Sequence, residues 1–421
     1  MNAIRYRSAG RRARRSLSCE RLEDRQLLTV NFLSGDTDLA PAVNDQQYVA
    51  LAQGDSGFLA VWMDERSVLS GAPATTSPLN GNGQDIYGQV LDLQGQPLGN
   101  PLVIASMGHD QTKPDVAWNE TAGAWLVAFD SQDPEWYFHD QVYGVRVAEN
   151  GTLLDAEPRL LFEQDGNQGI FDVDVASDGT DWAIVATKFH GSPLEGAVFG
   201  RRMAADGTML DLQPQLITAG DMMMPDIEYA DDSYLIAAKD RVTDQIYVLR
   251  TDTTLAPIGG RTLVGAGDYP GPRLASNGSD FLLVGQAAHR ISSTGQVLDP
   301  AGIALGGSGF AGPQRDAAWN GNHWSVSFLA ANGDVGLQRI DATGALLDSE
   351  PAFSTADAMN ESIAVGGVNG ESIVAFSDRP GFDQDIRGVR FDATGQATGA
   401  AFDLSLGRGR QSYVTSVDGP G

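Results

Sequence analysis

The chain has 421 residues, of which 42% are hydrophobic and 50 are glycine, and its formal net charge is −27. Such an acidic protein repels phosphate backbones, so the charge argues against a nucleic-acid partner. Cys19 is the only cysteine, which excludes internal disulfide bonds. No apolar run of about 18 residues occurs, and we therefore expect no transmembrane helix.

The first 28 residues form a basic leader with eight arginines against three acidic residues. The segment 20–29 reads Glu-Arg-Leu-Glu-Asp-Arg-Gln-Leu-Leu-Thr. It resembles the Leu-Glu-x-Arg-x-Leu-Leu-Ser segment at the start of large secreted and surface proteins of planctomycete bacteria. The resemblance implies export to the cell surface or the extracellular space; the alternative is a basic tail without a targeting role. In both cases we expect residues 1–28 to be disordered and to lie outside the fold.

A motif of Arg, four residues and Gly recurs after the leader at intervals of 40 to 56 residues. Repeats of this length, each with several short strands, are typical of β-propellers. We predict an all-β, seven-bladed propeller of four-stranded antiparallel blades over residues 29–407, with a disordered tail at 408–421. The seven copies begin at Val90, Arg146, Arg202, Arg250, Arg290, Arg339 and Arg390, and Leu255 replaces the glycine of the fourth.

The second copy shows the four predicted strands of a blade most clearly, at 113–118, 124–129, 140–147 and 158–162. The second of these strands is almost continuously apolar, which indicates a sheet covered on both faces, as in stacked blades. The seventh blade can take its fourth strand from either end of the chain, from 29–33 or from 401–405. Pairing of the two ends would close the ring and remove exposed strand edges.

The loops between strands fall into two sets on opposite faces of the predicted propeller. The first-to-second and third-to-fourth turns are short and uniform, whereas the second-to-third and blade-to-blade loops vary greatly in length. We name the second face the variable face. Variable loops on a rigid scaffold commonly carry binding sites, so we predict the ligand site there.

Aromatic side chains in the loop 131–139 offer flat apolar surfaces for a sugar ring or a protein partner. Three consecutive methionines between the third and fourth blades would add an adaptable apolar patch. The alternatives are a loop that covers the blade edge, methionines packed between blades, and histidines scattered over the surface. The candidate ligand-binding residues are Trp136, Tyr137, Phe138, His139, His190, Met222, Met223 and Met224.

Aspartates recur near the start of the first strand, which lines the channel of a propeller. A ring of carboxylates there would hold Ca²⁺ or another hard cation. The alternative is a solvated rim in which Arg273, at the same aligned position, pairs with a neighbouring acid; Tyr48 and Ser362 fill the other two aligned positions. A second acidic group occurs in the seventh copy. The candidate metal-binding residues are Asp115, Asp172, Asp226, Asp316, Asp378, Asp383 and Asp385.

The second acidic group belongs to a longer pattern that runs from the second strand into the third. The first copy reads Trp62-Met-Asp64-Glu-Arg66 and then Asp85-Ile-Tyr-Gly88. This Trp-x-Asp-x-Arg and Asp-Ile-x-Gly pattern resembles repeats of secreted bacterial propeller proteins of mostly unassigned function. We expect a structural role in which Asp caps turn amides and Arg pairs locally; the alternative is Ca²⁺ binding by Asp378, Asp383 and Asp385.

Motifs for catalysis are absent: the chain has no His-Glu-x-x-His, Gly-x-Ser-x-Gly or phosphate-binding loop. Residues 177–182 resemble the Asp-box of sialidases but fall in a first-to-second strand turn. Three functions stay open. We predict an extracellular or cell-surface module that binds a carbohydrate or a protein, with Ca²⁺ as an optional cofactor. The rivals are a secreted carbohydrate-active enzyme with central carboxylates and a structural surface component.

Overall fold

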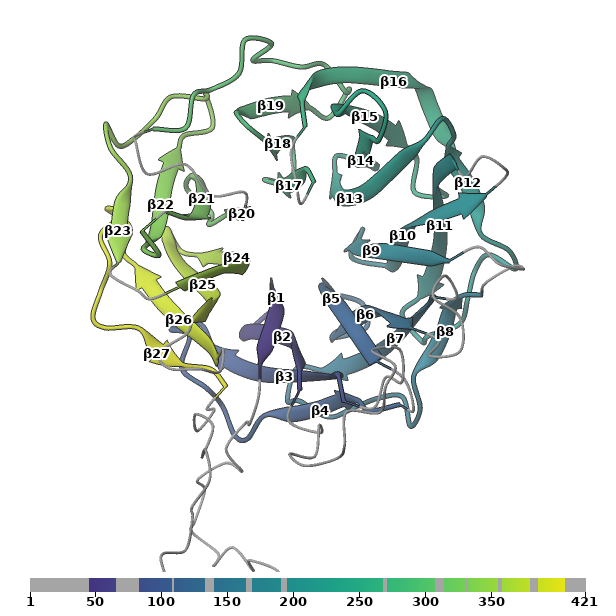
Figure 1. Ribbon diagram of the computed structural model, residues 1–421, viewed down its shortest axis with the longest axis horizontal. Coiled ribbons are helices and arrows are strands. Elements are labelled where there is room, and N and C mark those ends of the chain that lie inside the picture. The colour runs from purple at the N-terminus through teal and green to yellow at the C-terminus, as the bar shows by residue number, and fades with distance from the viewer. Residues whose placement is uncertain are drawn as a thin grey trace, which may run out of the picture. The chain divides into compact units, whose positions relative to one another are not determined.

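Seven antiparallel sheets surround a central axis, with the first strand of each sheet innermost (Figure 1). The predicted all-β seven-bladed propeller is therefore confirmed. The described residues all fall in one compact unit, Leu39–Gly421. The computed structural model describes residues 45–65, 83–107, 110–132, 140–163, 169–190, 195–267, 271–306, 314–330, 332–354, 358–378 and 385–405.

The strands follow the chain outward through each blade in turn. Blade one contains β1 (Gln46–Gln53), β2 (Gly57–Asp64), β3 (Asp85–Asp92) and β4 (Leu102–Ala105). Blade two contains β5 (Asp110–Asn119), β6 (Ala124–Gln132), β7 (Gln141–Ala148) and β8 (Arg159–Phe162). Blade three contains β9 (Ile170–Ser177), β10 (Asp181–His190), β11 (Glu195–Ala204) and β12 (Gln215–Thr218). Blade four contains β13 (Met222–Ala230), β14 (Ser233–Asp240), β15 (Gln245–Thr251) and β16 (Pro257–Ala266).

The last three blades continue the pattern with one variation. Blade five contains β17 (Arg273–Ser276), β18 (Asp280–Val284) and β19 (Ala288–Ser292), and an isolated bridge between Ala288 and Ile303 stands in place of a fourth strand. Blade six contains β20 (Arg315–Trp319), β21 (Trp324–Leu329), β22 (Val335–Ile340) and β23 (Ala352–Ser354). Blade seven contains β24 (Ala358–Val368), β25 (Glu371–Asp378), β26 (Asp385–Phe391) and β27 (Phe402–Asp403).

The seventh blade takes its fourth strand from the C-terminal side of the chain. In β27, Asp403 pairs with Arg387 of β26. The predicted strand at 401–405, rather than an N-terminal strand, therefore pairs with the third strand of this blade. The other predicted strand, 29–33, lies outside the described residues. Blades seven and one then pack face to face, with Phe58 and Trp62 in one apolar cluster with Ile373. Side-chain packing thus joins the first and last blades.

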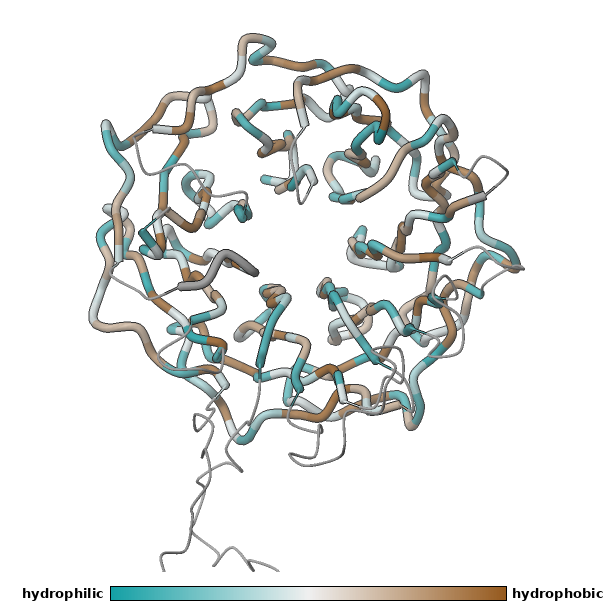
Figure 2. Tube along the Cα trace, in the orientation of Figure 1, coloured by the Kyte–Doolittle hydropathy of each residue, from teal (hydrophilic) through white to brown (hydrophobic). Residues whose placement is uncertain are grey.

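Apolar packing between neighbouring sheets holds the ring together. The second strands are the most deeply buried because they are covered by a blade on each side, and every residue of β2 is buried. The described residues form seven apolar clusters around the ring, and several combine residues of adjacent blades. Figure 2 shows the hydrophobic residues distributed around the whole ring rather than gathered in one place.

The repeated arginine joins two neighbouring blades. Arg146 binds Asp155 of its own blade in bidentate fashion, and its Nη1 donates to the carbonyl of Ala205 in the next blade, at 3.0 Å. Its guanidinium lies against Gly207, where an added Cβ would come within 2.7 Å of Arg146 Cζ. Gly207 has a φ of +86°, a conformation that glycine adopts without strain. The motif therefore links an arginine of one blade to the glycine turn of the next.

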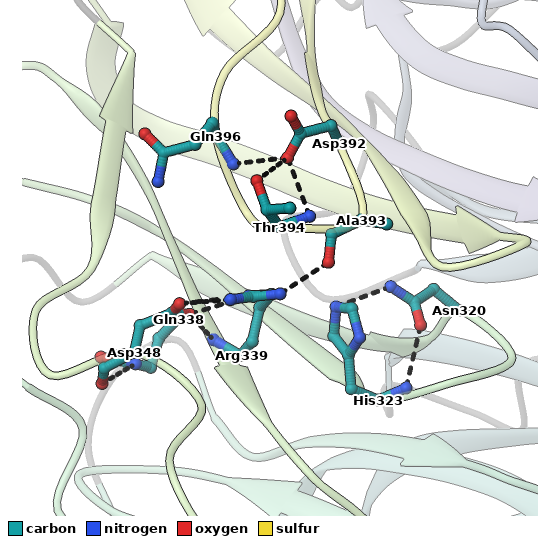
Figure 3. A network of polar contacts seen from close by, with 9 residues as sticks. All are labelled: Asn320, His323, Gln338, Arg339, Asp348, Asp392, Ala393, Thr394 and Gln396. Carbon is teal, nitrogen blue, oxygen red and sulfur yellow. Dashed lines mark hydrogen bonds and ion pairs between the residues drawn. The ribbon is translucent and has the colours of Figure 1, made fainter.

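We call this arrangement the arginine latch, and it recurs where Asp stands nine residues after the arginine. Figure 3 shows the latch of Arg339, which contacts Asp348 and the carbonyl of Ala393 in blade seven, beside the buried pair of Asn320 and His323. The four complete latches pair Arg146 with Asp155, Arg202 with Asp211, Arg290 with Asp299, and Arg339 with Asp348.

Removal of one latch should weaken the ring measurably. We expect Arg202→Ala to lower the free energy of unfolding by about 2 kcal/mol, because Asp211 loses a bidentate charged partner. Arg250 is the matched control: it occupies the same repeat position, but Gly259 stands where the latch requires Asp. Arg250→Ala should cost less than about 1 kcal/mol. Urea unfolding monitored by tryptophan fluorescence measures both, and equal losses would contradict the latch.

Candidate functional site

A cavity of about 830 Å³ lies on the axis of the ring, lined by the first strands of all seven blades. Its size falls within the range of about 300–1,000 Å³ that is usual for small-molecule sites. The cavity wall carries several acidic side chains together with Arg273 and Lys113. It is therefore the part of the described chain in which charged groups of many blades converge.

Four aspartates of the channel wall accept a hydrogen bond from the backbone amide of the following blade. Each lies on the innermost strand and reaches an amide of the next innermost strand, so the carboxylates tie the blades together at the axis. We call these residues the aspartate ring. The four bonds are Asp115 to Val175 at 2.8 Å, Asp174 to Ile227 at 2.7 Å, Asp226 to Leu274 at 2.8 Å and Asp316 to Val365 at 2.8 Å.

The structure changes the membership of the ring that the sequence alignment predicted. In blade three the equivalent of Asp115 is Asp174, because Trp182 pairs with Ser177 as Trp125 pairs with Trp118. Asp172 lies two residues earlier. The alignment was wrong in blade three because its first hairpin is two residues shorter than that of blade two: Ser177 and Trp182 are five positions apart, whereas Trp118 and Trp125 are seven apart. The same error placed Tyr48 and Ser362 in the ring, where the register puts Ala50 and Ala364.

Arg273 is the cation of the aspartate ring. Its Nη1 lies 3.2 Å from Asp226 Oδ2, and its side chain keeps 41% of its surface exposed to the channel, against 7% for Asp226. The ion pair agrees with the alternative in which Arg273 pairs with a neighbouring acid. Desolvation nevertheless raises the pKa of Asp226 to about 7, and that of Asp115 to about 6. One arginine therefore leaves part of the negative charge of the ring uncompensated.

A β-bulge interrupts the innermost strand of each of the first four blades, two residues before the ring position. The pairing of β1, β5, β9 and β13 with their neighbours shifts at this point. One residue of each bulge has a positive φ, between 48° and 54°, which is strained for a side chain other than glycine. We call these residues the bulge residues: Tyr48, Lys113, Asp172 and Met224.

All four bulge residues line the cavity, near the ends of the inner strands that meet the variable face. Lys113 Nζ forms an ion pair with Asp172 Oδ1 at 2.8 Å, across the boundary between blades two and three. The same ammonium lies 6.0 Å from the centre of the Phe171 ring. Tyr48, from the neighbouring blade, is 38% exposed. The channel mouth thus combines an exposed aromatic ring with a charged pair.

The three predicted methionines separate in the structure. Met222 is 1% exposed and belongs to the apolar cluster between blades three and four, as in the alternative of packing between blades. Met223 is half-buried on β13. Met224 lines the cavity, and its amide donates to Thr187 Oγ1 at 3.0 Å. Only Met224 therefore belongs to the channel mouth.

The other predicted ligand residues cannot be placed in this site. Trp136, Tyr137, Phe138 and His139 lie outside the described residues, so their role stays a prediction. His190 ends β10, where its backbone pairs with Glu195.

The predicted metal ligands do not converge on one point in the described part of the chain. Asp378 of blade seven pairs with Arg387, and Asp385 lies opposite Asp378 in the ladder, whereas Asp383 is outside the described ranges. Within those ranges no three side chains of His, Cys, Asp or Glu come together as a metal site would require. Asp115, Asp226 and Asp316 instead hold amides of the neighbouring blades.

Sequence reasoning missed Tyr48 and Lys113 as site residues. A signal for the bulges was present, because Pro114 and Pro225 interrupt segments that otherwise read as strands. Proline within a sheet is confined to edge strands, strand starts and bulges. Innermost strands with an internal proline therefore predict a bulge, and a bulge commonly redirects a side chain near a functional site.

Comparison with solved structures shows the same fold in proteins of different kinds. The BP39L lectin of Burkholderia pseudomallei matches with a TM-score of 0.52 and 11% identity over 86% of this chain and 99% of the lectin. A puromycin hydrolase matches with a TM-score of 0.53 and 13% identity over 87% of this chain, which spans only 55% of the hydrolase. A Dyadobacter fermentans protein of unknown function has a TM-score of 0.49, 10% identity and coverage of 84% and 96%.

The chain is thus a β-propeller of the architecture seen in a bacterial lectin and in other proteins. No family model and no curated protein matches the sequence. Among the described residues, no helix is long and apolar enough to cross a membrane.

The acidic channel should make stability depend on pH through Glu228, which lines the cavity. Desolvation and the nearby Asp226 raise the pKa of Glu228 from 4.5 to about 8. The folded state thus keeps a proton that the unfolded chain releases, so this group lowers stability as pH rises from about 4.5 to 8. We expect Glu228→Gln to raise the melting temperature over the wild type, by a margin that grows from pH 5 to pH 8.

Thermal unfolding in one buffer series measures this margin, and Glu371→Gln makes the same chemical change at an exposed position. A margin for Glu228→Gln that stays constant or shrinks over this pH range would show that the carboxyl is not desolvated in the channel.

Proposed function

We propose that this chain is an extracellular binding module that holds a carbohydrate at the channel mouth, on the variable face. The observation that carries the proposal is the set of bulge residues around a cavity of about 830 Å³. Four blades place a strained residue at the same position, and all four side chains line one cavity. Strained backbone is retained where the surrounding structure holds it for a purpose, which supports a site at this point.

The chemistry of the mouth suits a sugar. The ring of Tyr48 offers an exposed flat surface for the apolar face of a pyranose. Lys113 supplies donors for hydroxyl groups, and Asp172 Oδ1, which pairs with Lys113, supplies an acceptor. A neutral polyhydroxylated ligand makes such bonds without adding charge to an already acidic channel.

Two further observations support this proposal. The lectin of Burkholderia pseudomallei shares the fold along 99% of its length, so this architecture serves sugar binding elsewhere. The resemblance of the leader to planctomycete export segments favours a location outside the cell. The aromatic loop 136–138 connects the second and third strands of blade two, and we propose that it adds contacts from the variable face.

A carbohydrate-active enzyme with central carboxylates is a weaker interpretation. A carboxylate pair for such an enzyme would come from Asp115, Asp172 and Asp226. Asp115 and Asp226 accept a neighbouring amide and so have a structural task, and Asp172 is paired with Lys113. Arg273 lies among them and pairs with Asp226. The geometry therefore favours binding over bond cleavage.

A glycan array with the full chain tests the proposal directly. We expect binding to a restricted set of saccharides, and Tyr48→Ala should weaken it about tenfold through loss of the aromatic contact. Phe353→Ala is the matched control, since Phe353 is a similarly exposed aromatic on the outermost strand β23, with 43% of its surface accessible.

The outcomes separate the possible functions. Loss of binding in Tyr48→Ala with retention in Phe353→Ala supports a site at the mouth. Equal binding by both variants would move the site elsewhere on the propeller. An array without any binding would overturn the carbohydrate proposal in favour of a protein partner or a structural component.

A further inference from the structure

A group of buried oxygen atoms lies between blades two and three, behind the channel mouth. Thr112 of β5 and Asp130 of β6 are opposite each other in the ladder, so their side chains share one face of the sheet at about 5 Å between Cβ atoms. The amide of Asp172 donates to Asp130 Oδ2 at 3.1 Å, which brings the third residue to the same place. Thr112 is 6% exposed and Asp130 is 2% exposed.

Each of these three residues has one buried oxygen without a hydrogen-bond partner among the described residues: Thr112 Oγ1, Asp130 Oδ1 and Asp172 Oδ2. A buried polar atom without a partner is costly, and native proteins rarely leave several together. Three such atoms on residues that adjoin one another therefore indicate a bound species.

The charges near this group do not balance. Asp130 and Asp172 contribute two negative charges, and Lys113 contributes one positive charge through its ion pair with Asp172 Oδ1. Asp140 adds further negative charge near Asp130, and Tyr48 acts on Lys113. Burial raises the pKa of Asp130 well above its usual range, so this carboxylate requires either a proton or a cation. An uncompensated buried carboxylate is strongly unfavourable, so the bound species should carry positive charge.

From these observations we infer that a hard monovalent cation such as sodium binds between Thr112, Asp130 and Asp172. Carboxylate and hydroxyl oxygens are the ligands that hard cations prefer. One positive charge balances the set of Asp130, Asp172 and Lys113, and the Lys113 ammonium repels a divalent ion more strongly than a monovalent one. The site differs from the calcium sites predicted from the sequence, because it uses two carboxylates and a threonine hydroxyl rather than a ring of acids.

The position of this site gives it a role in shaping the mouth. Lys113 and Asp172 are bulge residues that line the cavity, whereas Thr112 and Asp130 lie outside its lining. A cation bound to Asp172 Oδ2 would fix one oxygen of the carboxylate, while Lys113 fixes the other, Oδ1. The inference stands independently of carbohydrate binding, since it concerns the free protein.

Thermal unfolding of the full chain at pH 7.5 tests the inference in sodium chloride and in choline chloride of equal ionic strength. We expect sodium to raise the melting temperature by about 2 °C, because a ligand that binds only the folded state stabilises it. Asp130→Asn and Thr112→Val should lose this rise. Thr251→Val is the matched control, since Thr251 is also fully buried with an unpartnered hydroxyl, in blade four and away from this group.

The comparison of the variants decides between the explanations. A sodium effect that survives in Thr251→Val but not in Thr112→Val supports the site even if Asp130→Asn folds poorly. Absence of a sodium effect in the wild type would overturn the inference and leave water or a shared proton between the oxygens. A rise with calcium chloride alone would overturn the charge argument, and a sodium effect retained by all variants would place the ion elsewhere.

Discussion

The hydrogen bond from a backbone amide of one blade to an aspartate of the blade before it sets the geometry of the channel. Asp115, Asp174, Asp226 and Asp316 repeat this bond around the axis. Each bond fixes the relative position of two neighbouring innermost strands along the channel axis. The same bonds draw carboxylates into a narrow space, where desolvation raises their pKa values. Blade packing and the acidic character of the channel therefore have one common origin.

The arginine latches perform a similar task farther from the axis. Arg146, Arg202, Arg290 and Arg339 each connect an aspartate of their own blade to a turn of the next blade. A blade is thus tied to its neighbour both at the channel and at the third-to-fourth strand turn. Such a frame is rigid enough to hold strained residues such as Lys113 and Asp172 at the channel mouth.

Much of the fold could be predicted from the sequence because the repeat has a direct physical meaning. The glycine of the motif occupies a turn with positive φ, and in the fourth copy Leu255 adopts the same conformation with a φ of +63°. The aspartate that pairs with the arginine was not predicted. It lies nine residues later in the chain, and the two side chains meet only because the chain reverses direction after the third strand. The fourth strand of blade seven could not be chosen from the sequence, because residues 29–33 and residues 401–405 were both predicted as strands for that place.

The site was harder to predict than the fold. Hairpin spacing aligns the innermost strands correctly only when the hairpins have equal lengths, and the shorter first hairpins of blades one and three moved the alignment to Tyr48 and Asp172. A bulge in each of these strands places the same two residues in the lining of the cavity, and hairpin spacing does not reveal a bulge that lies beyond the aligned position. Thr112 and Asp130 gave no signal, because an unpartnered oxygen is a property of packing in space.

The central claim is that the bulge residues around the channel mouth form a ligand site. A crystal structure of the full chain with a saccharide that binds it tests this claim most directly. The account predicts the sugar ring against Tyr48, with its hydroxyl groups bonded to Lys113 and Asp172. A saccharide bound on the outer strands, or on the face of the short turns with an empty mouth, would contradict the account.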